Sequence, residues 1–129
     1  MRCAAALVIV AAISAAAALA AQQPGFTRTP LQDQPISVSG RHGVTARVEI
    51  AAGVESGRHM HPGEEFGYVL EGALQLEIDG RALQTFKTGD VFFIPAGVVH
   101  NGRNNGSVKT TFIGTYVVES GKPLSAPAK

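Results

Sequence analysis

The residues that could do chemistry are concentrated in two stretches of the chain. The first, GVESGRHMHPGEEFGYVLEG, contains His59 and His61, and Glu65 follows four residues after the second histidine. Because side chains two apart on a strand lie on the same face, both imidazoles can reach one metal ion. The second stretch, GDVFFIPAGVVHNGRN, adds His100. We predict that these four side chains bind a single transition metal inside a small β-barrel.

This ligand set indicates which metals the site could hold. Three neutral imidazoles and one carboxylate suit a divalent transition metal, namely Fe, Mn, Ni, Co, Cu or Zn, and ligand softness does not choose among them. Four protein ligands leave up to two positions open on a six-coordinate ion, for water, dioxygen or a chelating substrate. The fourth histidine of the chain, His42, lies outside both stretches and is interpreted as a loop residue.

Groups for acid–base chemistry are harder to identify, and the catalytic residues stay unassigned. The spacing selects Glu65 as the ligand, so the adjacent Glu64 is expected to face solvent, with an acid–base role as the alternative. Tyr68 is the other candidate near the ligands. Arg47 and Arg58 have the geometry to bind a substrate carboxylate bidentately, although an arginine on an exposed strand or turn is usually solvated.

Strand aromatics are expected to pack in the core rather than to contact substrate. They include Phe66, Phe93, Phe112 and Tyr116. One or two of them could line a pocket beside the metal.

Composition limits the class of protein. The chain has 129 residues, enough for one domain, and its formal net charge is +1. No basic run or stripe indicates binding to nucleic acid or to an anionic membrane surface. The one cysteine, Cys3, lies before an apolar N-terminal stretch. Removal of that stretch would leave no thiol for a disulfide, a nucleophile or a metal ligand.

The N-terminus has the layout of a secretory signal peptide. Arg2 precedes a run of small apolar residues that continues to Ala21, and Ala18-Leu19-Ala20 is typical of a cleavage site. An uncleaved membrane anchor is the alternative. We expect a secreted protein, periplasmic if the source is Gram-negative, with no stable membrane association after cleavage.

The rest of the chain favours short strands over helices. Alternating or apolar runs predict strands at 44–50, 59–61, 66–70, 74–78, 81–86, 91–94 and 109–118. Asp79-Gly80 predicts a hairpin, and residues 101–107 (NGRNNGS) predict a loop. The polar segment before Gly40 is expected to be an extended arm with at most one edge strand, near Ile36–Val38. Many short strands separated by Gly/Pro turns indicate an all-β sandwich or barrel.

The two stretches together resemble the two sequence motifs of the cupin superfamily. Glycines at the starts and ends of the motifs, the three histidines, Glu65, Pro95 and Asn104 stand at the family's spacing. This resemblance, to small single-domain cupins of the quercetin-dioxygenase-like type, implies a jelly-roll barrel with a metal in its mouth. It assigns the ligand roles to His59, His61, Glu65 and His100, and no ligand role to Asn104.

The predicted organisation follows from the resemblance and the composition. A signal peptide at 1–20 precedes an N-terminal arm at 21–43, a cupin β-barrel at 44–118 and a C-terminal tail at 119–129. Barrels of this kind often dimerise through edge strands and N-terminal arms, so the arm could serve in a homodimer.

Several functions are compatible with such a site. The leading expectation is a metal-dependent dioxygenase acting on a small oxygen-chelating substrate. A non-catalytic cupin that binds a metal or small ligand is the first alternative. A metal-dependent decarboxylase, lyase or isomerase is the second, because a fold does not determine a chemistry.

Overall fold

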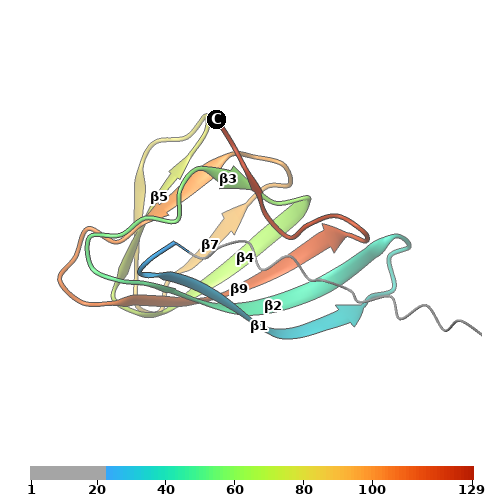
Figure 1. Ribbon diagram of the computed structural model, residues 1–129, viewed down its shortest axis with the longest axis horizontal. Coiled ribbons are helices and arrows are strands. Elements are labelled where there is room, and N and C mark those ends of the chain that lie inside the picture. Colours follow the sequence, from blue (N-terminus) through green and yellow to red (C-terminus); the bar gives the residue numbers. More distant parts are fainter. Residues whose placement is uncertain (1–22) are drawn as a thin grey trace, which may run out of the picture.

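The described part of the protein consists of two facing β-sheets. The structure is a computed structural model that describes residues 23–129, and the predicted signal peptide lies outside this range. The elements of this range are ten strands, β1 to β10, in two five-stranded antiparallel sheets (Figure 1). No helix within it is long and apolar enough to cross a membrane. The predicted all-β jelly-roll barrel is confirmed.

Sheet A has the strand order β1-β2-β9-β4-β7. Its strands are β1 (Phe26–Pro35), β2 (Arg41–Ile50), β9 (Thr110–Glu119), β4 (Gly63–Glu71) and β7 (Val91–Ile94). The pairs β2–β9, β1–β2 and β4–β9 form the longest ladders of the described chain. Strands β1 and β7 are the two edges of this sheet.

Sheet B has the strand order β10-β3-β8-β5-β6. Its strands are β10 (Ala126–Pro127), β3 (His59–Met60), β8 (His100–Arg103), β5 (Ala73–Ile78) and β6 (Gln84–Lys87). The sheet therefore joins the C-terminal end of the chain to the segments that contain the predicted metal ligands.

Alternating side chains of both sheets form the core between them. On β2, every second residue from Val44 to Ile50 is buried, and β5 buries Leu74, Leu76 and Ile78 in the same way. This is the period-2 pattern that the sequence displays. The buried apolar residues form two clusters, a larger one that includes Ile50, Leu74 and Phe92 and a smaller one of Val44, Ala46, Tyr116 and Val118. Polar side chains, among them three histidines, are also buried.

Two glycines make room for large side chains in this core. Gly67 on β4 and Gly114 on β9 are Cα partners. A Cβ atom on Gly67 would lie 1.9 Å from the Phe92 ring, and one on Gly114 would lie 2.7 Å from the Tyr116 hydroxyl. The aromatic rings therefore occupy the space that side chains at these positions would need.

The N-terminal arm differs from the prediction. The edge strand is β1, at Phe26–Pro35, and the predicted position, Ile36–Val38, lies in the turn that leads to β2. The prediction was wrong because prolines were read as strand breakers. Pro30 and Pro35 lie on an edge strand, where a missing backbone donor is tolerated.

Two boundaries in sheet B were also wrong. The segment predicted as a loop from Asn101 begins as strand β8, which pairs with β5 up to Arg103. The return strand after Asp79-Gly80 begins at Gln84, not at residue 81, because Leu76 is the last β5 residue that pairs with β6. A turn still forms at the predicted place, where the Arg81 amide donates to the Ile78 carbonyl.

Strands at both ends of the chain lie outside the predicted barrel range, 44–118. Strand β1 pairs with β2 along almost its whole length, and β10 pairs with β3. The C-terminal segment crosses from sheet A to sheet B next to β3 (Figure 1). Both ends of the described chain are therefore built into the sheets that hold the candidate site.

Candidate metal centre

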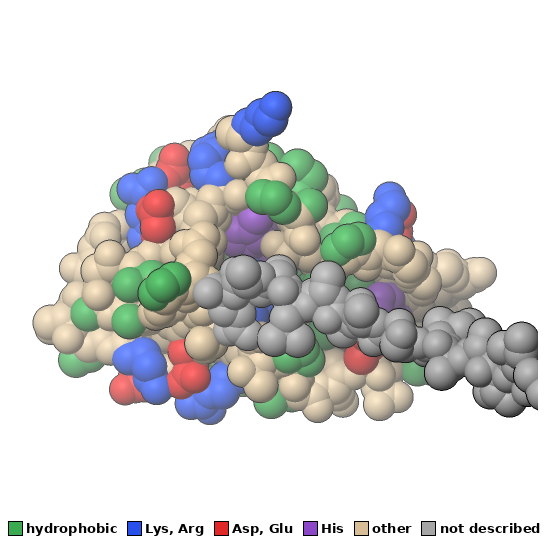
Figure 2. All heavy atoms as spheres, in the orientation of Figure 1, with side chains coloured by type: hydrophobic (Ala, Val, Ile, Leu, Met, Phe, Trp, Pro, Cys, Tyr) green, Lys and Arg blue, Asp and Glu red, His purple; other side chains and the backbone are tan. Residues whose placement is uncertain are grey.

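The four predicted ligands meet inside the barrel. His59 on β3 and His100 on β8 are Cα partners in sheet B, and His61 follows two residues later. Glu65 projects from β4 in sheet A. All four side chains are buried, and one ring nitrogen from each histidine lies within 4.8 Å of the others. Histidine side chains are visible in a hollow near the centre of the face in Figure 2.

The orientation of each imidazole is set by a backbone carbonyl. In every case Nδ1 is the donor, because a carbonyl oxygen can only accept. The distances are 2.8 Å from His59 to Gly57, 2.7 Å from His61 to Leu124 and 2.9 Å from His100 to Val98. Nε2 of each neutral ring then has a free lone pair, as metal-binding histidines require.

The Glu65 carboxylate faces these lone pairs. Its Oε2 lies 3.2 Å from Nε2 of His61 and 3.6 Å from Nε2 of His100. Nε2 of His61 is buried and has no hydrogen-bond partner among residues 23–129. Two acceptor groups at this distance repel each other unless a cation or a proton lies between them. The donor set therefore fits a divalent metal, with His59, His61, His100 and Glu65 to hold it.

The protonation states suit metal binding. Burial, followed by the neighbouring His100 imidazole, lowers the pKa of His59 to about 3. Burial likewise lowers the pKa of His100. Burial alone would raise the pKa of Glu65, but a proton or positive charge on the side of His61 and His100 outweighs it and lowers the pKa below its usual value. Near neutral pH, His59 and His100 are therefore uncharged and Glu65 is ionised.

Tyr116 is a buried phenol next to these groups. It is the Cα partner of Glu65, and its ring packs edge-on against His61 with a centroid separation of 4.7 Å. Its hydroxyl has no hydrogen-bond partner among the described residues. Burial, and then the negative charge of Glu65, raise the pKa of Tyr116 well above its usual value. The phenol therefore keeps its proton and is a potential donor.

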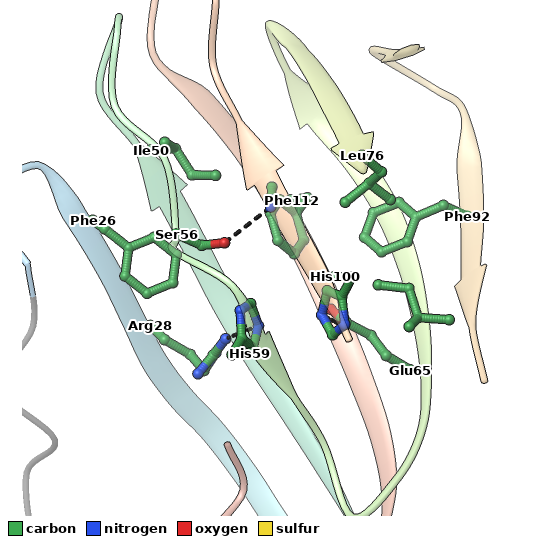
Figure 3. A pocket seen from close by; sticks show the side chains of 12 residues that line it. Phe26, Arg28, Ile50, Ser56, His59, Glu65, Leu76, Phe92, His100 and Phe112 are labelled. Atoms are coloured by element: carbon green, nitrogen blue, oxygen red, sulfur yellow. Dashed lines mark hydrogen bonds and ion pairs between the residues drawn. The ribbon is translucent and has the colours of Figure 1, made fainter. Parts of the chain in front are cut away.

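A small pocket adjoins the histidines. The volume of this cavity is about 20 Å³, enough for one or two waters. Apolar rings and aliphatic side chains line one end, and His59, Glu65 and His100 lie at the other (Figure 3). The Arg28 guanidinium points toward His59, with 3.4 Å between Nη2 and Nε2. The pocket is mostly apolar with charged groups at one end.

The predicted catalytic candidates lie outside this pocket. Tyr68 is on the outer face of β4 and is 47% exposed. The Glu64 side chain is 39% exposed, and its carboxylate lies 3.9 Å from Arg41. Both positions alternate with the inward-facing Glu65, so the pleat of β4 directs them away from the metal ligands.

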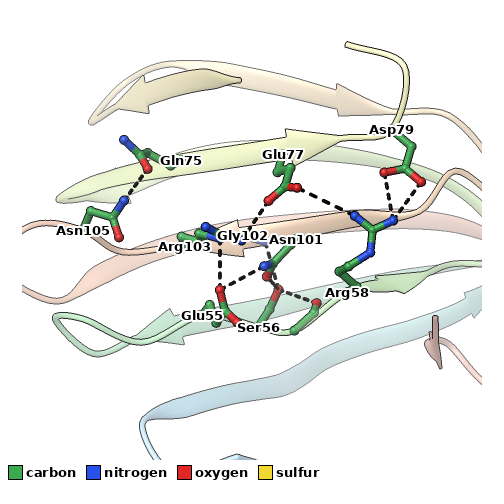
Figure 4. Close-up of polar contacts among 11 residues, drawn as sticks. Glu55, Ser56, Arg58, Gln75, Glu77, Asp79, Asn101, Gly102, Arg103 and Asn105 are labelled. Carbon is green, nitrogen blue, oxygen red and sulfur yellow. Dashed lines mark hydrogen bonds and ion pairs between the residues drawn. The ribbon is translucent and has the colours of Figure 1, made fainter. Parts of the chain in front are cut away.

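The arginines considered for substrate binding are paired elsewhere. Nη2 of Arg58 donates to both carboxylate oxygens of Asp79, at 3.0 Å and 2.9 Å, in a network on the outer face of sheet B (Figure 4). Arg47 lies 3.7 Å from Glu49 on the outer face of β2. Neither guanidinium reaches the pocket.

His42, which lies outside both motifs, and the motif residue Asn104 both make structural contacts. His42 is on β2, not in a loop, and its imidazole contacts Asp33 on β1. The Asn104 amide donates to the carbonyls of Ile50 and Val108 at 2.9 Å and 2.8 Å and closes the loop after β8. Neither residue joins the ligand cluster.

Arg28 and the Leu124 carbonyl were not expected at the site, and Tyr116 was expected only as one of several strand aromatics that could line a pocket beside the metal. Arg28 shares the inward parity of Phe26, two residues before it, but the segment was read as an arm rather than a strand. Tyr116 shares the buried parity of Phe112 and Val118, which indicates an inward side chain but not its neighbours. The Leu124 carbonyl gives no sequence signal, because any residue has one.

Curated relatives include plant proteins. The chain is 37% identical to germin-like protein subfamily 2 member 1 of Arabidopsis thaliana over 76 residues, 55% of this chain and 35% of that protein. It is 34% identical to germin-like protein 5-1 of Oryza sativa subsp. japonica over 97 residues, 70% of this chain and 41% of that protein. The chain thus spans about two fifths or less of the length of these relatives.

Solved structures share the fold. A Klebsiella pneumoniae protein with a double-stranded β-helix domain superposes with a TM-score of 0.67 at 19% identity, covering 84% of this chain and 88% of that one. An oxalate oxidase superposes with a TM-score of 0.60 at 26% identity, covering 67% of this chain and 46% of that one. Residues 46–119, more than half of the chain, match the cupin domain family, Cupin_2. The protein is therefore a member of the cupin family.

Proposed function

We propose that this cupin is a metal-dependent enzyme of the dioxygenase type that acts on a small oxygen-chelating substrate. The observation that carries the proposal is the donor set. Three imidazoles hold their Nδ1–H groups on backbone carbonyls, so three lone pairs and the Glu65 carboxylate are left for one ion. The bound metal supplies a Lewis acid with positions open to substrate oxygens and to dioxygen.

The chain's own residues supply orientation, exclusion of water and a proton. The carbonyls of Gly57, Leu124 and Val98 hold the rings in the ligating orientation. Apolar side chains line the other end of the pocket and exclude bulk water. Tyr116 has a protonated hydroxyl near Glu65 and is positioned to give a proton to a developing oxyanion.

The size of the pocket bears on the substrate. A cavity of about 20 Å³ must open to admit either a flavonol or a β-diketone, and the flavonol requires much the larger opening. A compact enolic compound such as a β-diketone has two oxygens at a chelating distance and few other atoms. We therefore expect compact β-diketones to be better substrates than flavonols.

Oxygen uptake by iron-loaded protein tests the proposal. We expect metal-dependent consumption of a β-diketone with one dioxygen per substrate, loss of this activity in His100→Ala, and full activity in the matched variant His42→Ala. An absence of uptake with β-diketones and flavonols alike, in protein shown to contain metal, would refute the dioxygenase type.

The second candidate is a non-catalytic cupin that binds a metal or small ligand. One observation favours it: the predicted acid–base candidates Glu64 and Tyr68 face away from the pocket, and the Ser56 hydroxyl that lines it already donates to the Gly57 carbonyl. Tyr116 is left as a neutral donor without a hydrogen-bond partner in the described chain. In that case metal binding would survive and no substrate in the panel would turn over. A decarboxylase, lyase or isomerase would depend on the same tyrosine.

A further inference from the structure

Arg28 is a cation at the metal pocket with no carboxylate to pair with. It lines the pocket beside His59, and its Nε is buried without a hydrogen-bond partner among residues 23–129. No carboxylate of that range lies within 4.0 Å of its guanidinium, whereas four arginines on the outer surfaces each have an acidic partner. These are Arg41, Arg47, Arg58 and Arg103.

The one side-chain hydrogen bond of Arg28 in the described chain is long, and it is incompatible with a bound metal. Nη2 lies 3.4 Å from Nε2 of His59, and Nδ1 of the same ring is already occupied by the Gly57 carbonyl. Nε2 of a neutral imidazole has a single lone pair, so Arg28 and a metal compete for it. With the metal bound, Arg28 keeps only its stacking contacts with Phe26 and Tyr116, whose ring centroids lie 5.5 Å and 5.9 Å from Cζ.

The charge at the site then favours an anion. A divalent ion and the Arg28 guanidinium bring three positive charges, and Glu65 is the one carboxylate among the residues that line the pocket. Histidines that bind a metal do so as neutral imidazoles, so the net charge of the metal-loaded site is +2 in mostly apolar surroundings. Arg28 is partly buried and its Nε is fully buried, so a partner for the guanidinium is favourable, and a carboxylate is the partner that a guanidinium binds bidentately.

We propose that Arg28 binds the carboxylate of a small α-hydroxy- or α-oxo-acid whose other oxygen reaches the metal. This rests on the proposed function, because it uses the same metal position. The small pocket restricts the ligand to few atoms beyond the two oxygen groups. Arg28 lies outside the residues that match the cupin family, 46–119, so the family assigns it no role.

Calorimetric titration of the zinc-loaded protein with glycolate and with its neutral amide, glycolamide, isolates the charge. Wild type is expected to bind glycolate more tightly. Arg28→Gln is expected to weaken glycolate binding by about 10- to 100-fold, with glycolamide binding changed little. Arg28→Lys should restore part of the preference, and the matched surface variant Arg47→Gln should leave it unchanged.

The affinity for zinc is a second measurement, and Arg28→Gln should change it in the opposite direction to the affinity for glycolate. Because Arg28 competes for Nε2 of His59 and repels a cation, Arg28→Gln is expected to raise the affinity for zinc while it lowers the affinity for glycolate. A residue that merely packs against Tyr116 would not move the two affinities in opposite directions. An unchanged ratio of glycolate to glycolamide affinity in folded Arg28→Gln would overturn the proposal.

Failure of the proposed function gives a different result. Calorimetry measures glycolate binding without any turnover. The titration of a metal-loaded protein that lacks oxygenase activity therefore still tests the role of Arg28. If the chain binds no metal, the same titration of the metal-free protein decides it. Glycolate binding that Arg28→Gln abolishes would then support the role of Arg28, and no binding would overturn it.

Discussion

The individual side chains of the site are arranged for a cation that lies between them. Nε2 of His61 and Oε2 of Glu65 are both acceptors, and they stand 3.2 Å apart with both groups buried. In the metal-free protein this arrangement stores electrostatic repulsion or requires a proton. A bound metal would be attracted by all four groups, the three imidazoles and the carboxylate, and would remove the repulsion between them. Metal binding and folding should therefore be coupled.

The low pKa of His59 predicts how the stability of the metal-free protein depends on pH. The unfolded chain takes up a proton at this residue near pH 6.5, whereas the folded chain does so only near pH 3. Stability is therefore fully present above pH 6.5 and is lost as the pH falls through this window, by about 1.4 kcal/mol per pH unit for this group. Urea unfolding in EDTA between pH 4 and pH 7 measures the slope.

His59→Asn provides the comparison for this slope. The free energy of unfolding of the variant should fall less steeply as the pH decreases, because its unfolding takes up about one proton fewer than that of the wild type. Equal slopes for wild type and variant would contradict the assignment of a depressed pKa to His59.

Tyr116→Phe separates the tyrosine's proton from its packing. The hydroxyl has no hydrogen-bond partner in the described chain, so its removal should change the free energy of unfolding by less than about 1 kcal/mol. Metal content should not change, and turnover should fall by about 100-fold or more if the phenol is the proton donor. Unchanged kcat in metal-replete Tyr116→Phe would remove this role.

The strands determine which of these residues a sequence can reveal. The spacing of His59, His61, Glu65 and His100 predicted a cluster that the structure brings together, because period-2 strands and short turns leave little freedom over such distances. Arg28, Tyr116 and the Leu124 carbonyl reach the site from segments distant in sequence. Their placement depends on the pairing of β1, β9 and β10, which no local pattern specifies.

The C-terminal segment has a role at the site that the sequence did not lead us to expect. The Leu124 carbonyl accepts the Nδ1–H of His61 at 2.7 Å, and β10 pairs with the strand that contains His59. Removal of residues 122–129 is therefore expected to weaken metal binding by about 10- to 100-fold while the barrel stays folded. Metal titration and circular dichroism measure the two effects.

A shorter deletion is the control for this prediction. Removal of residues 128–129 leaves both the Leu124 carbonyl and β10 in place and should leave the metal affinity unchanged. Equal affinities for both truncated proteins would show that the carbonyl contact has no influence on His61.

The outer faces of the two sheets differ in character across the whole molecule. On sheet B, charged pairs link β5, β8 and the segment before β3 (Figure 4). On sheet A, large apolar side chains of β4 and β7 are 40–68% exposed. We name as the apolar patch Phe66, Tyr68, Leu70, Val91 and Phe93. The Phe66 and Phe93 rings lie 5.1 Å apart, tilted by 51°, and Tyr68 and Val91 are also cross-strand partners, so the two strands share this patch.

The apolar patch gives the predicted homodimer a concrete surface. It adjoins β7, an edge of sheet A, so a second copy could cover the apolar side chains and approach the open edge together. We expect Phe66→Glu combined with Val91→Lys to yield monomers in light scattering. The matched change Leu83→Lys, on sheet B's side of the molecule and 60% exposed, should not affect the mass.

The most direct test of the account is the metal content of the protein purified without added metal or chelator. We predict about one divalent transition metal per chain, lost in both His61→Ala and His100→Ala and retained in His42→Ala. Full retention of the metal in both of the first two variants, or its absence from a folded wild-type protein that also fails to take up any of these metals on titration, would contradict a metal centre formed by His59, His61, Glu65 and His100.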